Sequence, residues 1–221
     1  MKTKILLSFF SLLLFVGCGT QTKVTGVWKS DEYKAEDFSK IAVIAITSNI
    51  KDRDLVEDAL VKKLNEIGYK AIPGSILLSP EMIKLKDKKV LESTLKKDSV
   101  DGALVISLLD VKEETYYVEG TNNYYSPRPY YGSFYNYYYY NYDRVYSPGY
   151  YATSTQIYLE SNFYSLNSNT LAQTIQTETV DPADVKDLAE SYSKIIIQQL
   201  VTGRVLKNKA LIEKRKAKEH K

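Results

Sequence analysis

Few residues in this chain of 221 could act as nucleophiles or metal ligands. There is one cysteine, Cys18, and one histidine, His220, which lies second from the end in a basic segment. A single cysteine excludes a disulfide within the chain, and one cysteine with one histidine cannot form a Cys/His zinc site. The lone histidine also excludes Ser-His-Asp and Cys-His arrangements of the usual kind. We therefore expect no metal site and no cofactor.

Carboxylates are plentiful, and six of them are candidates for acid–base chemistry. Four fall on one expected amphipathic helix whose first turn favours acids, so we interpret them as a solvent-exposed face: Asp52, Asp54, Glu57 and Asp58. Asp101 and Asp110 flank a strand that we expect to be buried, and they are the remaining candidates. The segment 46–49 after the first strand contains no glycine, so no phosphate loop is present there. These patterns predict that the chain is not an enzyme.

The amino terminus has the pattern of a bacterial lipoprotein signal. Lys2 and Lys4 are followed by a largely apolar run at 5–16, which is shorter than the roughly 20 residues that a spanning helix needs. The run ends in Phe15-Val16-Gly17-Cys18, which resembles the lipobox, whose cysteine receives a diacylglycerol and often a further acyl chain such as palmitate. Residues 1–17 are then a signal peptide, and Cys18 is the lipid attachment site. The alternatives are an ordinary secretory signal and a buried apolar helix that happens to be followed by a cysteine.

The residue after Cys18 bears on the location. It is Gly19, whereas Asp at this position resembles the inner-membrane retention signal of diderm bacteria. We therefore favour the outer membrane, with the chain on its periplasmic face and attached to the membrane through acylated Cys18. Residues 18–38 show little pattern and are expected to form a lipid-anchored tether, with Trp28 and Phe38 packing onto the body. The net charge of +3 gives no reason to expect a nucleic-acid partner.

The elements of the body follow from the spacing of apolar residues. Continuous β-branched runs predict buried strands at 41–46 and 103–111, the second continuing at 115–118. Helical spacing predicts a helix that ends at Gly68, then a short strand at 69–72. Further helices are expected to start at Ser79-Pro80-Glu81 and to cover 88–97.

The second half of the body predicts a hairpin and a long helix. Residues 155–166 alternate between apolar and polar side chains, and 171–180 form their antiparallel partner across a turn at 167–169. A helix follows from Asp181-Pro182 and ends at Gly203. The fold class is therefore α/β: one domain over 39–206, with a mixed β-sheet in the order β-α-β-α-β, a long Tyr-rich insertion, then β-β-α.

These segments together resemble a group of uncharacterised bacterial outer-membrane lipoproteins. The resemblance rests on the lipobox, the strand at 41–46, the helix segment from Arg53 to Gly68, the strand at 101–111, the insertion and the segment at 159–166. The fold of that group is similar to the amino-terminal domain of TolB and to the periplasmic domain of the curli-secretion lipoprotein. The group carries no established catalytic residues, so the resemblance implies none here.

The insertion at 119–150 is unusually rich in tyrosine. Between Tyr116 and Tyr151 lie 15 of the 20 tyrosines, mixed with Asn, Ser, Gly and Pro. Three interpretations stay open: a low-complexity disordered loop, a binding surface for an envelope protein or glycan, and a membrane-inserted hairpin. The residues of the possible ligand or partner surface are Tyr124, Tyr125, Tyr130, Tyr131, Tyr135, Tyr137, Tyr138, Tyr139, Tyr140 and Tyr142.

The basic tail at 207–221 carries seven Lys/Arg and two Glu. It is either a fraying helix end or a segment that docks on anionic partners such as phosphate-bearing lipid or glycan. The sequence as a whole predicts a lipid-anchored cell-envelope protein of structural or interaction type, facing the periplasm, as a binding or assembly module. The alternative is a glycan- or peptidoglycan-acting enzyme that uses the Tyr-rich loop as its substrate platform. The oligomeric state does not follow from the sequence.

Overall fold

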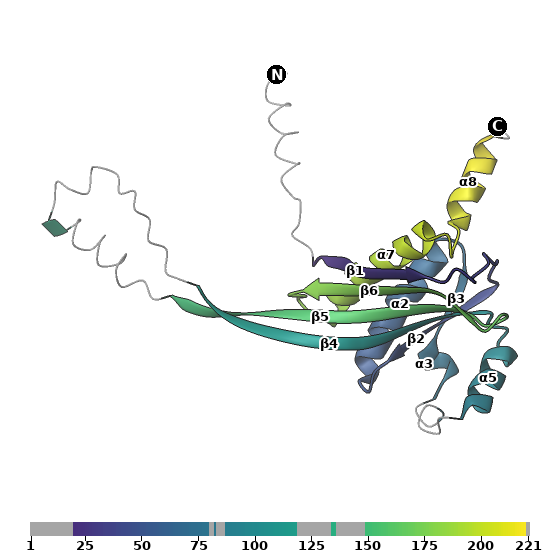
Figure 1. The fold of residues 1–221 in the computed structure, drawn as a ribbon. Helices are drawn as coiled ribbons and strands as arrows, with labels where there is room; N and C mark the ends of the chain where they lie inside the picture. Colours follow the sequence, from purple (N-terminus) through teal and green to yellow (C-terminus); the bar gives the residue numbers. More distant parts are fainter. Residues whose placement is uncertain (1–19, 80–81, 83–86, 119–133, 136–148, 220–221) are drawn as a thin grey trace, which may run out of the picture. The chain divides into compact units, whose positions relative to one another are not determined.

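The protein is a single mixed α/β domain built on an open six-stranded sheet (Figure 1). The computed structural model describes residues 20–79, 82, 87–118, 134–135 and 149–219. Its strands are β1 (Thr22–Lys29), β2 (Lys40–Ile46), β3 (Lys70–Pro73), β4 (Gly102–Val118), β5 (Tyr150–Ser165) and β6 (Thr170–Val180). Its helices within these residues are α2 (Ile50–Glu66), α3 (Gly74–Leu77), α5 (Lys88–Lys97), α7 (Val185–Thr202) and α8 (Lys209–Glu219). The α/β fold class predicted from the sequence is confirmed.

The sheet has the strand order β1-β6-β5-β4-β2-β3. β2 pairs in parallel with both β3 and β4, and β1 pairs antiparallel with β6. The chain leaves β2 for β3 on one side and then crosses to β4 on the other side. This reversal makes the carboxyl end of β2 a topological switch point, where ligands bind in open α/β sheets.

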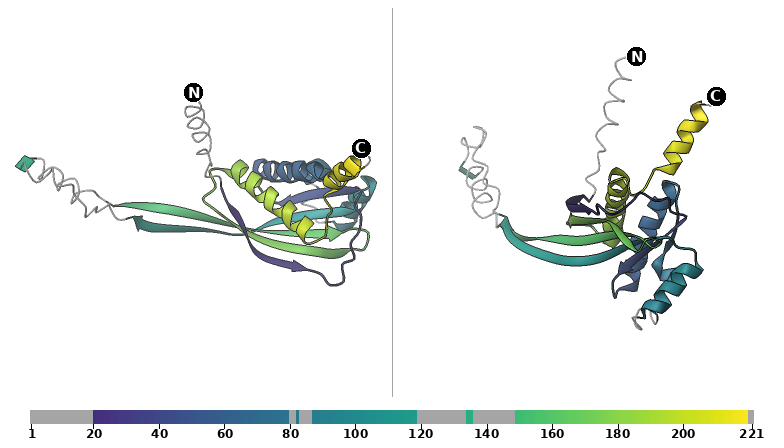
Figure 2. Two further views of the ribbon diagram at one scale, coloured as in Figure 1. Left: turned by 90° about the horizontal axis from the view of Figure 1, so that it is seen from above. Right: turned by 45° about the vertical axis from the view of Figure 1, so that its right-hand side comes forward.

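Each face of the sheet has its own core, because successive residues of β2 point to opposite faces. Ile41 and Val43 pack with buried residues of α2 and α7, such as Leu60 and Tyr192. Figure 2 shows these two helices side by side over one face. On the other face, Ala42 packs with buried residues of α3 and α5: Leu77 and Leu95.

The first strand was not predicted from the sequence, which assigned residues 18–38 to a tether. β1 is an edge strand, and its register with β6 shifts between Val24 and Gly26. Its buried contact is polar, since the hydroxyls of Thr22 and Thr179 lie 2.8 Å apart. Phe38 is buried and meets Phe163 edge-to-face, as expected, whereas Trp28 is 54% exposed.

β4 is longer and less buried than its pattern suggested. It is buried only as far as Ile106, and Leu108, Leu109 and Val111 are exposed. The chain divides into two compact units: unit 1 contains Met1–Val111 and Ile157–Lys221, and unit 2 contains Lys112–Gln156. The expected helix start at Ser79-Pro80-Glu81 lies partly outside the described residues.

Unit 2 includes the described residues 112–118, 134–135 and 149–156. Its described strand residues belong to β4 and β5, where the hydroxyls of Thr115 and Thr153 lie 3.3 Å apart. The rings of Tyr117 and Tyr151 have centroids 5.2 Å apart. Both tyrosines are exposed.

Candidate functional site

The carboxyl end of β2 borders an apolar groove of about 600 Å³. The end of β2 and the loop after it form one wall, and the residues after α3 and the first turns of α5 form the other. We call this the carboxyl-end groove, and its lining residues are Ile44, Ala45, Ile46, Thr47, Ser48, Leu78, Met82, Asp87, Lys88, Val90 and Leu91. Its position at the switch point and its largely aliphatic wall suit an apolar ligand or an apolar segment of a partner.

The acidic side chain in the described lining of the groove, Asp87, stabilises the helix that it precedes. Asp87 is the N-cap of α5, and its Oδ1 accepts hydrogen bonds from the backbone N–H groups of Lys89 (2.8 Å) and Val90 (3.4 Å). An N-cap carboxylate stabilises its helix by satisfying amide groups that lack partners within the helix. Among the described residues that line the groove, no pair of carboxylates is therefore arranged for acid–base catalysis.

Beside the groove, Glu57 is fully buried on α2. Its Oε1 accepts from the backbone N–H of Ala45 at 2.9 Å and from Nε of Arg53 at 3.0 Å. Its Oε2 accepts from the backbone N–H of Ser75 at 2.7 Å. One carboxylate thus ties the end of β2, the first turns of α2 and the start of α3 together at the switch point.

This burial corrects the interpretation of the acids on α2 as a solvent-exposed face. Asp58 is exposed, as expected, but Glu57 has no exposed surface and Arg53 is only 5% exposed. Two further atoms nearby are buried without a hydrogen-bond partner, Nη2 of Arg53 and Oδ1 of Asp54. The presence of an arginine four residues before a glutamate was the signal for a pair, but the same spacing is common on exposed helix faces.

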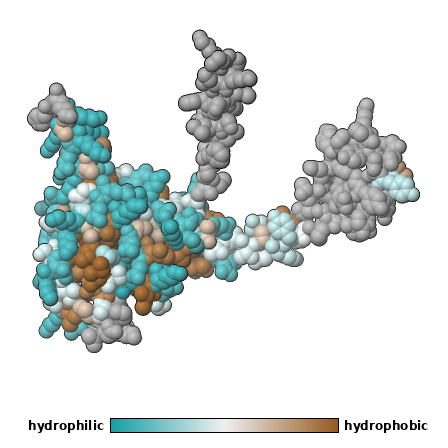
Figure 3. All heavy atoms as spheres, turned by 180° about the vertical axis from the view of Figure 1, so that it is seen from behind, coloured by the Kyte–Doolittle hydropathy of each residue, from teal (hydrophilic) through white to brown (hydrophobic). Residues whose placement is uncertain are grey.

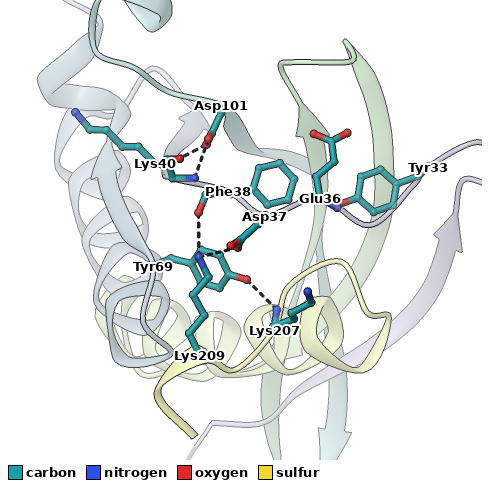
Figure 4. Close-up of polar contacts among 10 residues, drawn as sticks. Tyr33, Glu36, Asp37, Phe38, Lys40, Tyr69, Asp101, Lys207 and Lys209 are labelled. Carbon is teal, nitrogen blue, oxygen red and sulfur yellow. Dashed lines mark hydrogen bonds and ion pairs between the residues drawn. The ribbon is translucent and has the colours of Figure 1, made fainter. Parts of the chain in front are cut away.

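At the opposite end of the parallel strands, a polar clasp fastens the C-terminal segment to the body (Figure 4). Nζ of Lys209 lies 2.7 Å from the Asp37 carboxylate, donates to the Phe38 carbonyl at 3.1 Å and sits 4.2 Å from the ring centroid of Tyr69. The Tyr69 hydroxyl accepts from the backbone N–H of Lys207 at 2.9 Å. We call these five residues the C-terminal clasp. They make the first residues of the basic tail part of the folded body.

The clasp shifts the pKa values of its members in opposite directions. The Lys209 ammonium holds the pKa of Asp37 below its ordinary value of 3.8. Burial raises the pKa of the Tyr69 phenol above 10.0. A phenol that stays neutral and a carboxylate that stays charged keep the clasp intact at neutral pH.

Neither acid proposed for the enzyme alternative lines the carboxyl-end groove. The Asp101 carboxylate accepts from the backbone N–H groups of Ser39 (2.7 Å) and Lys40 (3.0 Å), which joins the start of β2 to the start of β4 (Figure 4). Asp110 is exposed and accepts from the N–H of the next residue at 2.9 Å. The enzyme alternative therefore loses its two named residues. Among the described residues, no group of three His, Cys, Asp or Glu could hold a metal ion.

The other predicted site residues lie almost entirely outside the described residues. Cys18 is among these, as are nine of the ten named tyrosines. Tyr135 is described, is 69% exposed and meets Phe134 edge-to-face at 5.4 Å. No helix of the described part of the chain is long and apolar enough to cross a membrane.

The surface carries exposed aliphatic side chains both in the groove and around it. Figure 3 shows hydrophobic patches that interrupt the hydrophilic surface on the side opposite to the view of Figure 1. In unit 1 the most exposed aliphatic residues include Ile46 (63%), Ile50 (61%) and Ile76 (73%). All three belong to segments at the carboxyl ends of β2 and β3.

This chain is similar to several solved structures, at 7–8% sequence identity. No known protein family and no curated protein sequence matches the chain. The PelC dodecamer from Paraburkholderia phytofirmans is similar with a TM-score of 0.42 and 8% identity, over 85% of this chain and 99% of PelC. Another crystal structure of that PelC, with one substitution, has a TM-score of 0.42 and 7% identity, over 80% and 95%. The lipoprotein GNA1162 from Neisseria meningitidis has a TM-score of 0.41 and 8% identity, over 74% and 99%. Likeness at this level carries no argument about ligand, partner or oligomeric state.

Proposed function

We propose that this chain is a lipid-anchored cell-envelope protein that acts as a binding or assembly module. In this proposal Cys18 carries the lipid, and the domain faces the periplasm from the outer membrane. The resemblance to the TolB amino-terminal domain and to the curli-secretion lipoprotein stays a prediction of the sequence.

The sequence pattern at residues 1–18 is the observation that supports a lipid anchor on Cys18. A basic start, a short apolar run and a lipobox-like end precede the only cysteine of the chain. One acyl chain binds a bilayer only marginally, whereas two or three bind stably, because each buried methylene contributes about 0.8 kcal/mol. The use of Cys18 for lipid also agrees with the lack of any other thiol that could pair with it.

The carboxyl-end groove supports the binding role. Its aliphatic wall can bury an apolar ligand, and the carboxylate of Asp87 in its described lining is used as a helix cap. Tyrosines offer a large contact area at low entropic cost, so the insertion at 119–150 is a second candidate surface for an envelope protein or glycan.

Metabolic labelling with a palmitate analogue tests the anchor. The wild-type protein should incorporate the label, and Cys18→Ala should incorporate none. Because Cys18 precedes β1, the Cys18→Ala variant should keep the circular dichroism spectrum and melting temperature of a folded domain, which shows that any loss of label is not misfolding. Equal labelling of the variant would contradict the proposal.

The location has its own test. In a diderm host, Gly19→Asp should move the protein from the outer-membrane fraction to the inner-membrane fraction of a density gradient. Gly19→Asn, which has nearly the same size and no charge, is the matched control. If wild type and both variants co-fractionate with the inner membrane, the proposed outer-membrane location is wrong while the anchor stands.

A further inference from the structure

The described chain is fastened to the body from its first residue. The Thr20 hydroxyl donates to the carboxylate of Asp187 at the start of α7. The backbone N–H of Thr22 donates to the Ser191 hydroxyl at 3.0 Å, and the Thr22 hydroxyl lies 2.8 Å from that of Thr179. Cys18 stands two residues before Thr20, and two residues span at most about 7 Å. A lipid on Cys18 therefore leaves this end of unit 1 almost no freedom to move away from the bilayer.

The carboxyl ends of the parallel strands lie at the same end of unit 1. The turn between β5 and β6 is fastened beside the start of β4, because the Leu166 N–H donates to the Asp101 carbonyl at 2.9 Å. β6 therefore starts where β4 starts and runs towards the end where β2 and β4 finish. β1 begins opposite the end of β6, with Thr22 paired to Thr179 (Figure 1). We call this the anchor end, defined by Thr22, Ile46, Val111 and Val180.

Exposed aliphatic side chains gather at the anchor end. Ile46 is 63% exposed, Ile50 61%, Leu109 50% and Val111 46%. They come from the end of β2, the start of α2 and β4. Single exposed aliphatic residues need no explanation, but several at one end of a domain are typical of a protein or membrane contact.

Charge distinguishes between kinds of lipid surface. Asp52 and Asp187 lie in the first turns of α2 and α7, which both begin at the anchor end, Asp54 follows on α2, and Asp184 caps α7. Two exposed lysines, Lys51 and Lys186, lie in the same first turns, so these four acids outnumber the lysines beside them. These acids would be repelled by anionic headgroups. The contact must then depend on the tether and on apolar side chains, and not on electrostatic attraction to anionic lipid.

We infer that the anchor end is the bilayer-facing surface of the domain, with its aliphatic side chains in the headgroup region of the membrane. This inference rests on the proposed acylation of Cys18. The C-terminal clasp then lies at the far end, because the eight residues of β1 span about 24 Å between the two ends.

Lysine acetylation on vesicles tests this orientation. The chain from Cys18 to Lys221 is coupled through Cys18 to maleimide-bearing lipid in zwitterionic phosphatidylcholine vesicles, then treated with an acetylating reagent and analysed by mass spectrometry. Lys51 and Lys186 are exposed at the anchor end, and Lys97 and Lys218 are exposed at the end of α5 and on α8. Acetylation of the first two should fall several-fold on vesicles compared with the uncoupled chain, and acetylation of the last two should stay unchanged. The same protection should persist at high salt.

A variant with a longer tether is the matched control. A Gly-Ser linker of about 20 residues between Gly19 and Thr20 has an end-to-end distance of about 25 Å and should remove the protection of Lys51 and Lys186. Equal acetylation of all four lysines with and without vesicles would overturn the orientation and assign the exposed aliphatic residues to a protein partner. Because the lipid is attached chemically, absence of acylation in cells would contradict the proposed function alone.

Discussion

Replacing Glu57 with alanine should destabilise the domain strongly, because this side chain is fully buried and accepts three hydrogen bonds. The change leaves the backbone N–H groups of Ala45 and Ser75 without an acceptor. It also leaves the Arg53 guanidinium, whose side chain is 6% exposed, as an uncompensated buried charge.

The expected loss is about 3–5 kcal/mol of unfolding free energy, the range measured when one partner of a buried ion pair is removed. For a domain of this size, each kcal/mol lowers the melting temperature by about 2–4 °C, so the expected decrease is about 6–20 °C. Glu66→Ala on the same helix is the matched control. Glu66 pairs with Lys63 at 2.7 Å, but both side chains are at least a third exposed, so its loss should cost no more than about 1 kcal/mol.

Urea denaturation followed by circular dichroism measures both variants, with the slope of the transition checked for constancy. The double variant Arg53→Met, Glu57→Gln should be more stable than Glu57→Ala, because it leaves no unpaired charge and keeps an oxygen for the Ala45 N–H. If Glu57→Ala is no more destabilising than Glu66→Ala, the argument that Glu57 holds the switch point together is refuted.

Three further predictions concern other parts of the molecule. Burial raises the pKa of the Tyr192 phenol above 10.0, so its stabilising effect is present below pH 10 and is lost as the pH rises further. Tyr192→Phe should remove this alkaline loss and, by leaving the Ser161 hydroxyl unpaired, cost about 1–3 kcal/mol at neutral pH in urea titrations. Lys209→Met should accelerate amide hydrogen exchange in α8, and it should remove a small stabilisation that is present above pH 3.8 and lost as the pH falls and Asp37 is protonated. Replacing residues 124–150 with a short Gly-Ser turn should leave the melting temperature of unit 1 within a few degrees of wild type, since each doubling of loop length costs only about 0.6 kcal/mol. Collapse of the domain on deletion would show that the tyrosines belong to its core.

Local patterns predicted the elements whose stability depends on local features. The helix expected at 88–97 is α5 with the same bounds, because Asp87 offers a cap and the apolar residues recur at helical spacing. Gly68 was expected to follow the end of α2, and it adopts φ +93°, which favours glycine. The run expected at 41–46 is largely buried on both faces of β2 as far as Ala45, as a parallel strand between helical layers must be, whereas Ile46 at its end is exposed.

Tertiary features did not follow from such patterns. β1 was missed because its buried side chain is a threonine and a register shift at Gly26 disturbs the alternation. The burial of Glu57 depends on amide groups of Ala45 and Ser75, which only the β2-α2-β3 crossover brings to one carboxylate. The carboxyl-end groove likewise needs three segments that are separate in sequence, so no single motif could reveal it.

The position of the C-terminal clasp limits the side from which an anionic partner can bind the basic tail. Its first residues are fastened at the far end of unit 1, about 24 Å from the anchor end by the length of β1. Screening reduces electrostatic attraction beyond about 8 Å at physiological salt, so α8 cannot be held by the headgroups of the anchoring bilayer if the anchor end faces it. An anionic partner of the tail must then approach from the opposite side. Removing residues 211–221 should leave binding of the lipid-coupled chain to vesicles unchanged and weaken its retention on an anionic polymer such as heparin. Loss of vesicle binding on this truncation would contradict the separation of the two ends.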